Sequence, residues 1–240
     1  MKYLAHISYD GSHFEGFQRL NNGRGVQNEL ERVLSIIAKK RVVVKGAGRT
    51  DALVHAFDQC ISFDLDLNIE VNRLKYILNR NLSKYISVLF VEKVNPDFHA
   101  RFDAKGKVYL YKIYLGEKNP FLQDYTYQLS RRVDVAKMEE AAKVFVGTHN
   151  FANFVSGYKK SYESTIFSIS LTLEGDIVSI KFWGVGFFRY MVRSIVGALI
   201  EVGLGKVSIE NLKMAINCPD QQIRFLVAPA CGLYLLKVLY

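Results

Sequence analysis

The sequence predicts an α+β fold made of two ferredoxin-like halves, each with the element order β-α-β-β-α-β, an antiparallel sheet and helices on one face. Apolar residues recur with period 2 and period 3.6 in alternating segments along all 240 residues. The same order of strands and helices occurs twice, and with only 4 prolines a long flexible linker is not expected. Because Pro96 interrupts the pattern near the middle, we expect domains at residues 1–103 and 104–240.

In the first half, the residues at every second position from Tyr3 to Tyr9 are apolar and predict a strand with one buried face. Residues 26–41 show helical spacing and end in Lys39, Lys40 and Arg41, which suit the negative end of a helix dipole. The remaining patterns predict, in order, a short strand over 42–44, a strand around 61–63, a helix over 71–78 and a strand over 86–91.

The second half repeats this order. Two alternating runs, residues 167–173 and 178–182, flank the turn Glu174-Gly175-Asp176 and predict a β-hairpin. A long amphipathic helix is expected over residues 188–203. The other predicted elements are a strand over 108–114, a helix over 135–145, a short helix over 209–216 and a last strand over 233–240.

Composition excludes several classes of protein. Hydrophobic residues make up 50% and aromatic residues 13% of the chain, which excludes disorder over most of its length. The 32 basic and 23 acidic residues give a net charge of +9, which favours a polyanionic partner such as nucleic acid, although an ordinary basic enzyme also fits. The first residues do not resemble a signal peptide and no apolar run could span a bilayer, so we expect a cytoplasmic protein.

The densest polar cluster is residues 46–56, GAGRTDALVHA, between two predicted strands. Its two glycines permit unusual backbone angles and close approach of a ligand. Asp51 is a candidate reactive carboxylate, because the neighbouring Arg49 favours its ionised form. The alternative is a turn in which a solvated Asp51 caps its own backbone.

A second cluster, residues 98–111, interleaves basic and aromatic side chains. Arg101 and Lys107 supply positive charge, and Tyr109 and Tyr111 share one face of a predicted strand. Aromatic rings stack on unpaired bases while cations hold phosphates, so this pattern suits RNA. The alternative is a core strand with two half-buried tyrosines.

A third cluster, residues 184–197, consists of a glycine-rich loop followed by the start of the long predicted helix. Arg189 and Arg193 are four residues apart and would share one helix face. Because Arg193 has apolar neighbours, it either snorkels outward or pairs with a buried acid. Pairs of basic residues elsewhere are either a path for RNA or ordinary solvated surface: Lys39 and Lys40, Arg131 and Arg132, Lys159 and Lys160.

Cofactor and metal motifs are not found in the sequence. It contains no phosphate-binding glycine loop, dinucleotide fingerprint or HExxH, so no cofactor is expected. The three cysteines, Cys60, Cys218 and Cys231, are far apart and include no CxxC, which argues against a disulfide framework or a zinc knuckle. The five histidines show no metal-binding spacing, and His6 and His149 are most simply structural or surface residues.

Six segments together resemble the tRNA pseudouridine synthase A family, in the same order along nearly the whole chain. They are YDGSHFEGFQR at 9–19, GRTDALVHA at 48–56, FHARFDA at 98–104, YLY at 109–111, GFFRYMVR at 186–193 and APACGLYL at 228–235. The resemblance implies a cofactor-independent isomerase with two ferredoxin-like halves around a basic cleft. It also implies a homodimer that converts uridine to pseudouridine in the anticodon arm of tRNA, at positions 38, 39 and 40.

Site residues follow from the same resemblance. Asp51 matches the catalytic aspartate, Tyr109 the tyrosine that packs on the target uracil, and Arg193 the arginine that pairs with the aspartate. Arg49 matches an arginine that helps to hold RNA. We also expect Arg101, Lys107 and Arg189 to bind RNA, and no metal to take part.

The sequence departs from the family pattern at three places. Leu53 stands where glycine is common, and if that position needs positive φ, Leu53 stores strain of about 1–3 kcal/mol. Phe17 replaces a common tryptophan, and a basic residue usual near Ser164 and Thr165 is missing. The rival hypotheses are a non-catalytic tRNA-binding protein on the same fold and a synthase that modifies other RNA positions.

Overall fold

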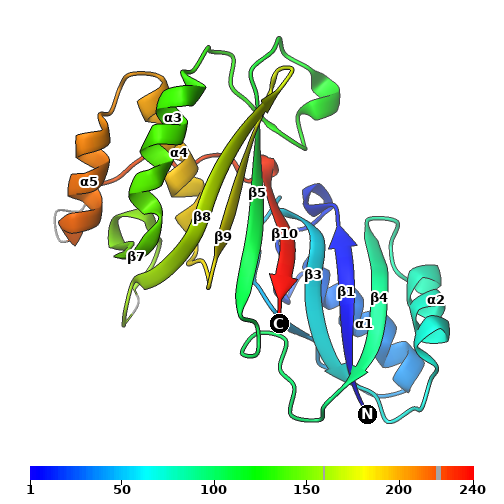
Figure 1. The fold of residues 1–240 in the computed structure, drawn as a ribbon. Helices are drawn as coiled ribbons and strands as arrows, with labels where there is room; N and C mark the ends of the chain where they lie inside the picture. Colours follow the sequence, from blue (N-terminus) through cyan, green and yellow to red (C-terminus); the bar gives the residue numbers. More distant parts are fainter. Residues whose placement is uncertain (159, 220–222) are drawn as a thin grey trace. The chain divides into compact units, whose positions relative to one another are not determined.

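The computed structural model describes residues 1–158, 160–219 and 223–240, which form a mixed α+β structure (Figure 1). The predicted α+β class is therefore confirmed, whereas the ferredoxin-like character of the two halves stays a prediction. The chain divides into two compact units, unit 1 with residues 1–105 and 234–240, and unit 2 with residues 106–233. These units differ from the predicted domains, 1–103 and 104–240, chiefly because the C-terminal strand belongs to unit 1.

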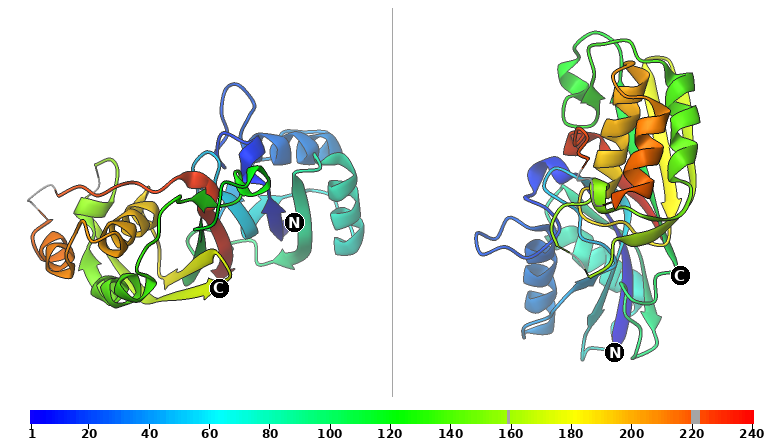
Figure 2. Two further views of the ribbon diagram at one scale, coloured as in Figure 1. Left: turned by 90° about the horizontal axis from the view of Figure 1, so that it is seen from above. Right: turned by 90° about the vertical axis from the view of Figure 1, so that its left-hand side faces the viewer.

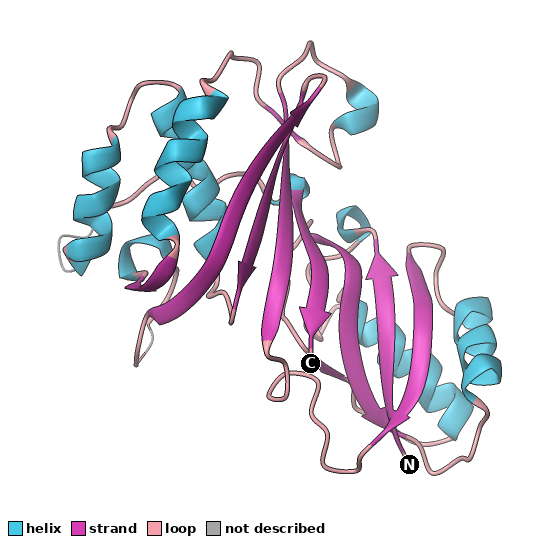
Figure 3. Cartoon of the chain, in the orientation of Figure 1, coloured by secondary structure: helices cyan, strands magenta, loops and turns pink. Residues whose placement is uncertain are grey.

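Unit 1 has the sheet order β4-β1-β3-β10, with the short β2 paired to β3 (Figure 3). β1 is antiparallel to both β3 and β4, and β10 is parallel to β3. Helices α1 and α2 lie on one face of this sheet (Figure 2). The elements are β1 (Lys2–Tyr9), α1 (Val26–Ala38), β2 (Lys45–Gly46), β3 (His55–Asp64), α2 (Val71–Asn81), β4 (Ile86–Val94) and β10 (Leu233–Leu239).

The core of unit 1 lies between the sheet and its two helices. The alternating residues of β1 from Tyr3 to Tyr9 are at most 5% exposed, which confirms the predicted buried face. Leu30 and Leu34 of α1, and Leu74 and Leu78 of α2, are also buried, at the helical spacing that the sequence showed.

The predicted strand over residues 42–44 is wrong, because this segment is an extended loop. Val42 and Val44 are buried as their β-branched character suggests. Their backbone N–H groups, however, donate to side chains of α1, Val42 to Ser35 Oγ at 3.0 Å and Val44 to Glu31 Oε1 at 3.0 Å. A buried N–H needs only one acceptor, so these side chains take the place of a sheet partner.

Unit 2 has the sheet order β5-β9-β8-β7, with the short β6 paired to β5 (Figure 3). The predicted hairpin is confirmed as β8 and β9, joined by Gly175 at a φ of +56°. Within the described ranges, no helix is long and apolar enough to cross a membrane. The elements are β5 (Gly106–Tyr114), β6 (Tyr127–Gln128), α3 (Val135–Ala142), β7 (Gly147–Asn150), β8 (Glu163–Glu174), β9 (Ile177–Gly184), α4 (Met191–Gly203) and α5 (Ile209–Asn217).

The long helix of unit 2 begins later than predicted. Tyr190 has a φ of +67°, in the left-handed region, so α4 starts at Met191 and not at residue 188. Arg189 therefore lies before the helix, and the expectation that Arg189 and Arg193 share a helix face is wrong. A residue in the left-handed conformation cannot continue a right-handed helix. The apolar periodicity of residues 188–190 therefore predicted the start of the helix too early.

One segment of extended chain crosses α4 at a glycine. Ala228 N donates to Arg193 O at 3.1 Å, and Arg193 Nε donates back to Ala228 O at 2.7 Å. A Cβ atom at Gly197, one turn further along, would lie only 1.7 Å from Leu226 O. Glycine at this position therefore allows the backbone of residues 226–228 to lie directly on the helix and to hold Arg193.

We expect Gly197→Ala to lower the free energy of unfolding by about 3 kcal/mol or more, because the new methyl group meets backbone that must move. Urea denaturation followed by circular dichroism measures this change. Gly186→Ala is the matched control, since nothing lies within 4 Å of its Cβ position. Equal stability of the two variants would mean that segment 226–228 can shift freely.

Candidate active site

Asp51 lies in the loop between β2 and β3 of unit 1, residues 47–54. Arg49 is exposed, Thr50 is 7% exposed and Asp51 is half-buried. The burial of Thr50 turns its two neighbours toward solvent. The sequence thus produces a loop that keeps an arginine and a carboxylate accessible while their shared neighbour is fixed in the core.

A buried hydrogen bond holds Thr50. Its Oγ1 lies 2.8 Å from Tyr9 Oη, at the end of β1. Burial raises the pKa of Tyr9 to about 12, so this hydroxyl is neutral throughout the physiological range. The Thr50 carbonyl also accepts the N–H of Phe17 at 3.0 Å. Two contacts from different segments therefore set the backbone immediately before Asp51.

A second anchor comes from Gln59 of β3, which is fully buried. Its side-chain amide donates to Gly48 O at 3.0 Å and its Oε1 accepts from Gly48 N at 3.2 Å. The glutamine amide thus donates one hydrogen bond and accepts another, as the backbone of a neighbouring strand would. Gly48 is thereby fixed from both sides.

Residues 10–17 pack closely under the loop. Gly16 has a φ of +107°, and a Cβ there would lie 3.0 Å from Thr50 O and 3.2 Å from Ala52 N. A Cβ at Gly11 would lie 2.1 Å from Val54 O. The glycines of the YDGSHFEGF segment are thus required for close approach of two backbones. Phe17, which replaces the family's tryptophan, is 2% exposed in this layer.

Leu53 has a φ of +66°, and Val54 N donates to Asp51 O at 3.2 Å. Residues 51–54 therefore form a β-turn whose third residue needs positive φ, the position that glycine favours. The strain expected for Leu53 from the sequence is confirmed in its backbone angle. The side chain is 47% exposed, so little packing offsets this strain.

His55 is the first residue of β3 and follows the loop directly. Its Nδ1 lies 3.0 Å from Gly11 N and 3.3 Å from Asp10 Oδ1, so the ring is held by the segment that packs under the loop. The ring stacks on Tyr234 of β10 at 4.7 Å, and Phe57 stacks on the same tyrosine at 5.0 Å. This aromatic stack joins β3 to the C-terminal strand within unit 1.

Tyr109 and Lys107 lie on β5 of unit 2, where Lys107 pairs with Gly184 and Tyr109 with Phe182 of β9. The Tyr109 ring is 8% exposed and contacts Phe187 edge to face, with ring centroids 5.2 Å apart. Both tyrosines of the segment are buried, more deeply than the half-buried pair of the alternative interpretation. Tyr111 differs in being fully buried, with its hydroxyl donating to Pro229 O at 2.7 Å.

Arg189 and Arg193 do not share a helix face, but both guanidinium groups contact the ring of Tyr190. Each guanidinium carbon lies 4.9 Å from the centre of the Tyr190 ring. Arg193 is half-buried, and its hydrogen bond to Ala228 O makes it a fixed side chain within unit 2, unlike one that snorkels. Sequence reasoning missed Tyr190, although an aromatic residue between two arginines is a visible signal for cation–π contacts.

The seven predicted site residues form three groups. Arg49 and Asp51 share the loop of unit 1, while Lys107, Tyr109, Arg189 and Arg193 belong to unit 2. Arg101 lies in an exposed turn of unit 1, its guanidinium carbon 6.0 Å from the ring centre of Phe102, which is 75% exposed. The predicted ion pair of Asp51 with Arg193 joins residues of different units and stays a prediction.

The described residues of the basic pairs lie on the surface of the protein, as both interpretations of them expect. Lys39, Lys40, Arg131, Arg132 and Lys160 are exposed, and Lys40 forms an ion pair with Asp66. Lys159 lies outside the described residues. The side chains of Tyr9 and Gln59, which hold the Asp51 loop, were not predicted, because their contacts join segments 41 and 11 residues apart.

Leu53→Gly should raise the free energy of unfolding by about 1 kcal/mol, since the relief of left-handed strain exceeds the added freedom of glycine in the unfolded chain. The measurement is the midpoint of urea denaturation. Lys39→Gly is the control, because Lys39 is the exposed C-cap of α1 with a φ of +52°. A gain for Lys39→Gly together with a loss for Leu53→Gly would show that the leucine side chain contributes packing that outweighs its strain.

Comparison with known proteins gives a consistent result. The family model described as tRNA pseudouridine synthase matches residues 5–103 and 141–240. The chain is 40% identical to tRNA pseudouridine synthase A 2 of Bacillus anthracis over 98% of each chain. It is 41% identical to tRNA pseudouridine synthase A of Geobacillus sp. (strain WCH70), over 98% of this chain and 96% of the relative.

Among solved structures, a Cbf5-Nop10-Gar1 complex matches 82% of this chain and 45% of that chain, with 11% identity and a TM-score of 0.37. This similarity is too low to define the fold. The matches to the family and to its relatives, in contrast, span both units and include the loop of Asp51 and the start of α4. The chain belongs to the tRNA pseudouridine synthase A family of isomerases.

Proposed function

We propose that this tRNA pseudouridine synthase acts on the anticodon arm, at positions 38, 39 and 40, as its resemblance implies. The target nucleotide must leave the base stack before its glycosidic bond is accessible, which costs a few kcal/mol. A net charge of +9 supports binding of a polyanion that supplies this energy through phosphate contacts.

Asp51 is the proposed reactive group. The observation that carries this proposal is that buried partners fix the backbone before Asp51, at Gly48 and Thr50, while the carboxylate stays half-exposed. A preorganised, accessible carboxylate suits attack on the ribose or removal of a ribose proton. The N1–C1′ bond breaks, and uracil leaves as an anion, turns, and bonds to C1′ through C5. This step releases the Asp51 carboxylate if it had attacked the ribose, or the ribose regains its proton if Asp51 had removed one. C5 then loses its proton and N1 gains one.

Tyr109 is proposed to stack on the uracil and to hold it while it turns. Its edge-to-face contact with Phe187 supports this role, because the contact restricts rotation of the tyrosine ring. Its hydroxyl is a candidate to assist proton removal from the carbon. No redox partner or group donor is needed, since the product is an isomer of the substrate.

Arg193 is proposed to pair with the Asp51 carboxylate and to keep it ionised. Its fixation by Ala228 and Tyr190 supports a positioning role, because the side chain is held before any substrate binds. Arg49, Arg101, Lys107 and Arg189 are proposed to hold RNA phosphates or bases. Arg101 with the exposed Phe102 is a suitable pair for an unpaired nucleotide.

The family pattern also leads us to propose a homodimer of chains with two ferredoxin-like halves, domains 1–103 and 104–240, around a basic cleft. Cytoplasmic location belongs to the same proposal, since its substrate is tRNA. Sedimentation velocity tests the dimer, and a monomer at all concentrations would contradict it.

Asp51→Asn should lower turnover by about 10²- to 10⁴-fold or more, because the amide is neither a nucleophile nor a base. tRNA binding should be largely kept, since phosphate contacts supply most of the affinity. Release of tritium from tRNA labelled at uracil C5 measures turnover, and filter binding measures affinity. Mapping of the modified positions in the product tRNA tests the anticodon-arm assignment.

Asp66→Asn is the matched control, because it removes the same charge from an exposed carboxylate outside the loop. Near-normal turnover by Asp51→Asn would exclude Asp51 as the reactive group. Loss of both turnover and binding would indicate a damaged loop, which circular dichroism distinguishes.

Arg193→Met should lower turnover by about 10²-fold, the usual effect of losing one electrostatic partner. Without the cation the pKa of the Asp51 carboxyl rises, so the acid limb of the pH–rate profile should move to higher pH. Arg193→Lys should restore only part of the activity, because one ammonium cannot copy a bidentate guanidinium.

Arg189→Met is the control for this series, since Arg189 contacts the same Tyr190 ring. We expect it to weaken tRNA binding without moving the acid limb. An unchanged acid limb in Arg193→Met would show that Arg193 does not act on the ionisation of Asp51.

A further inference from the structure

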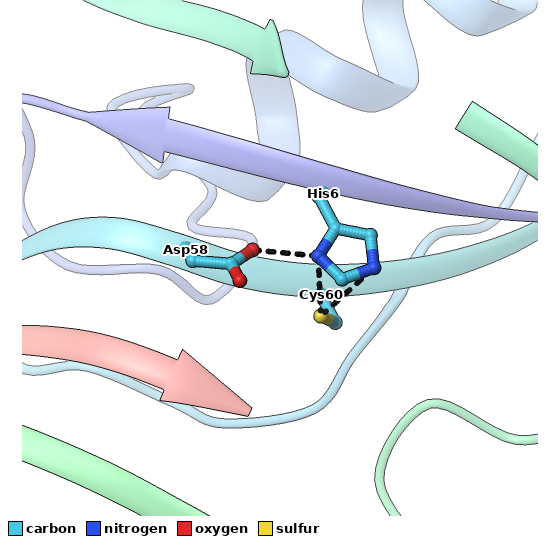
Figure 4. A group of neighbouring side chains, drawn as sticks. All are labelled: His6, Asp58 and Cys60. Carbon is cyan, nitrogen blue, oxygen red and sulfur yellow. Dashed lines mark hydrogen bonds and ion pairs between the residues drawn. The ribbon is translucent and has the colours of Figure 1, made fainter. Parts of the chain in front are cut away.

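Three side chains that the reaction does not use meet on the sheet of unit 1. His6 of β1 lies directly opposite Cys60 of β3 in the antiparallel register, and Asp58 is two residues before Cys60 on the same strand (Figure 4). His6 Nδ1 is 2.7 Å from Asp58 Oδ1 and 3.4 Å from Cys60 Sγ. These are the imidazole, carboxylate and thiol donors that proteins offer to zinc.

We propose that His6, Asp58 and Cys60 bind a divalent transition-metal ion, Zn²⁺, through one atom each. The possible ligand atoms of the three residues all lie within 4.8 Å of one another. A tetrahedral zinc site with ordinary bond lengths has ligand atoms about 3.3–3.6 Å apart. The distance from Cys60 Sγ to His6 Nδ1 already lies in this range. The distance from His6 Nδ1 to Asp58 Oδ1 is shorter, and a small rotation of the Asp58 side chain would lengthen it.

Exposure of the cluster is suitable for an ion that enters from solvent. The side chains of His6 and Asp58 are 23% and 22% exposed, whereas Cys60 is fully buried. The ion would thus meet two accessible ligands first and keep an open position for water. Two further charges lie near His6, the negative Glu92 of β4 and the positive Lys237 of β10.

A catalytic Cys–His–Asp triad is the alternative use of the same residues, and the geometry argues against it. In a triad the acid and the nucleophile contact opposite nitrogens of the imidazole ring. Here Asp58 and Cys60 both have their shortest distance to Nδ1, and Cys60 Sγ is 3.9 Å from Nε2.

The site would be separate from the isomerisation. His6 and Cys60 face away from the core side of the sheet, on which Ile7 and Gln59 lie opposite each other. An ion bound by β1 and β3 would cross-link the two strands. Binding to the folded chain alone raises its stability in proportion to the logarithm of ion concentration.

Titration of the chelator-treated full chain with Co²⁺ tests this proposal, because cobalt replaces zinc and reports its ligands by absorption. We expect one equivalent to produce a sulfur-to-cobalt charge-transfer band that Zn²⁺ abolishes. Zn²⁺ should also raise the thermal unfolding midpoint. Cys60→Ser should remove the band, and Asp58→Asn should weaken Co²⁺ binding by about tenfold or more.

Cys231→Ser is the control for the other thiols and should leave the band unchanged. Because Cys60 is buried, His6→Gln is a second variant with an accessible side chain, and it should also lose binding if Cys60→Ser misfolds. Absence of stoichiometric binding, or a band that survives Cys60→Ser and His6→Gln, overturns the proposal. Neither readout depends on turnover, so the proposed reaction can fail or hold independently.

Discussion

The buried contact between Tyr9 and Thr50 is the interaction on which the proposed site depends. It joins the end of β1 to the residue before Asp51, and both residues are buried. A buried polar group without a partner costs about 1–3 kcal/mol, so loss of the Tyr9 hydroxyl penalises Thr50. Tyr9 itself has a second hydrogen bond, with Gln59. Because Thr50 points inward, the side chains of Arg49 and Asp51 are directed outward, so one hydrogen bond in the core fixes the accessible part of the loop.

The backbone strain in this loop is tolerated because several hydrogen bonds hold the loop in one conformation. Left-handed backbone at Leu53 costs about 1–2 kcal/mol. Against this stand the paired hydrogen bonds of Gln59 with Gly48 and the N–H of Phe17 on Thr50, each contributing about 1 kcal/mol. Strain that is held by such contacts keeps a carboxylate in one position, which suits a reaction that depends on orientation.

Local periodicity predicted the elements whose residues repeat regularly, such as the buried face of β1 and the hairpin of β8 and β9. It failed where a side chain or a backbone angle overrode the pattern, at residues 42–44 and at Tyr190. Asp51 could be proposed as a site residue from the sequence because its motif is contiguous and resembles that of a family. Gln59 and the partners of His6 could not, because their contacts depend on strand register, which single-sequence spacing does not contain.

The strand register also explains why β3 contributes side chains both to the Asp51 loop and to the proposed metal site. Along β3 the side chains alternate, so Gln59 points to the core side and holds the Asp51 loop, while Asp58 and Cys60 point to the other face and meet His6. β1 has the same division, with Tyr9 on the core side and His6 opposite. The proposed metal ion would therefore connect the two strands that supply the anchors of the loop. Its effect on catalysis would be indirect, through the rigidity of β1 against β3, with no contact to the reacting atoms.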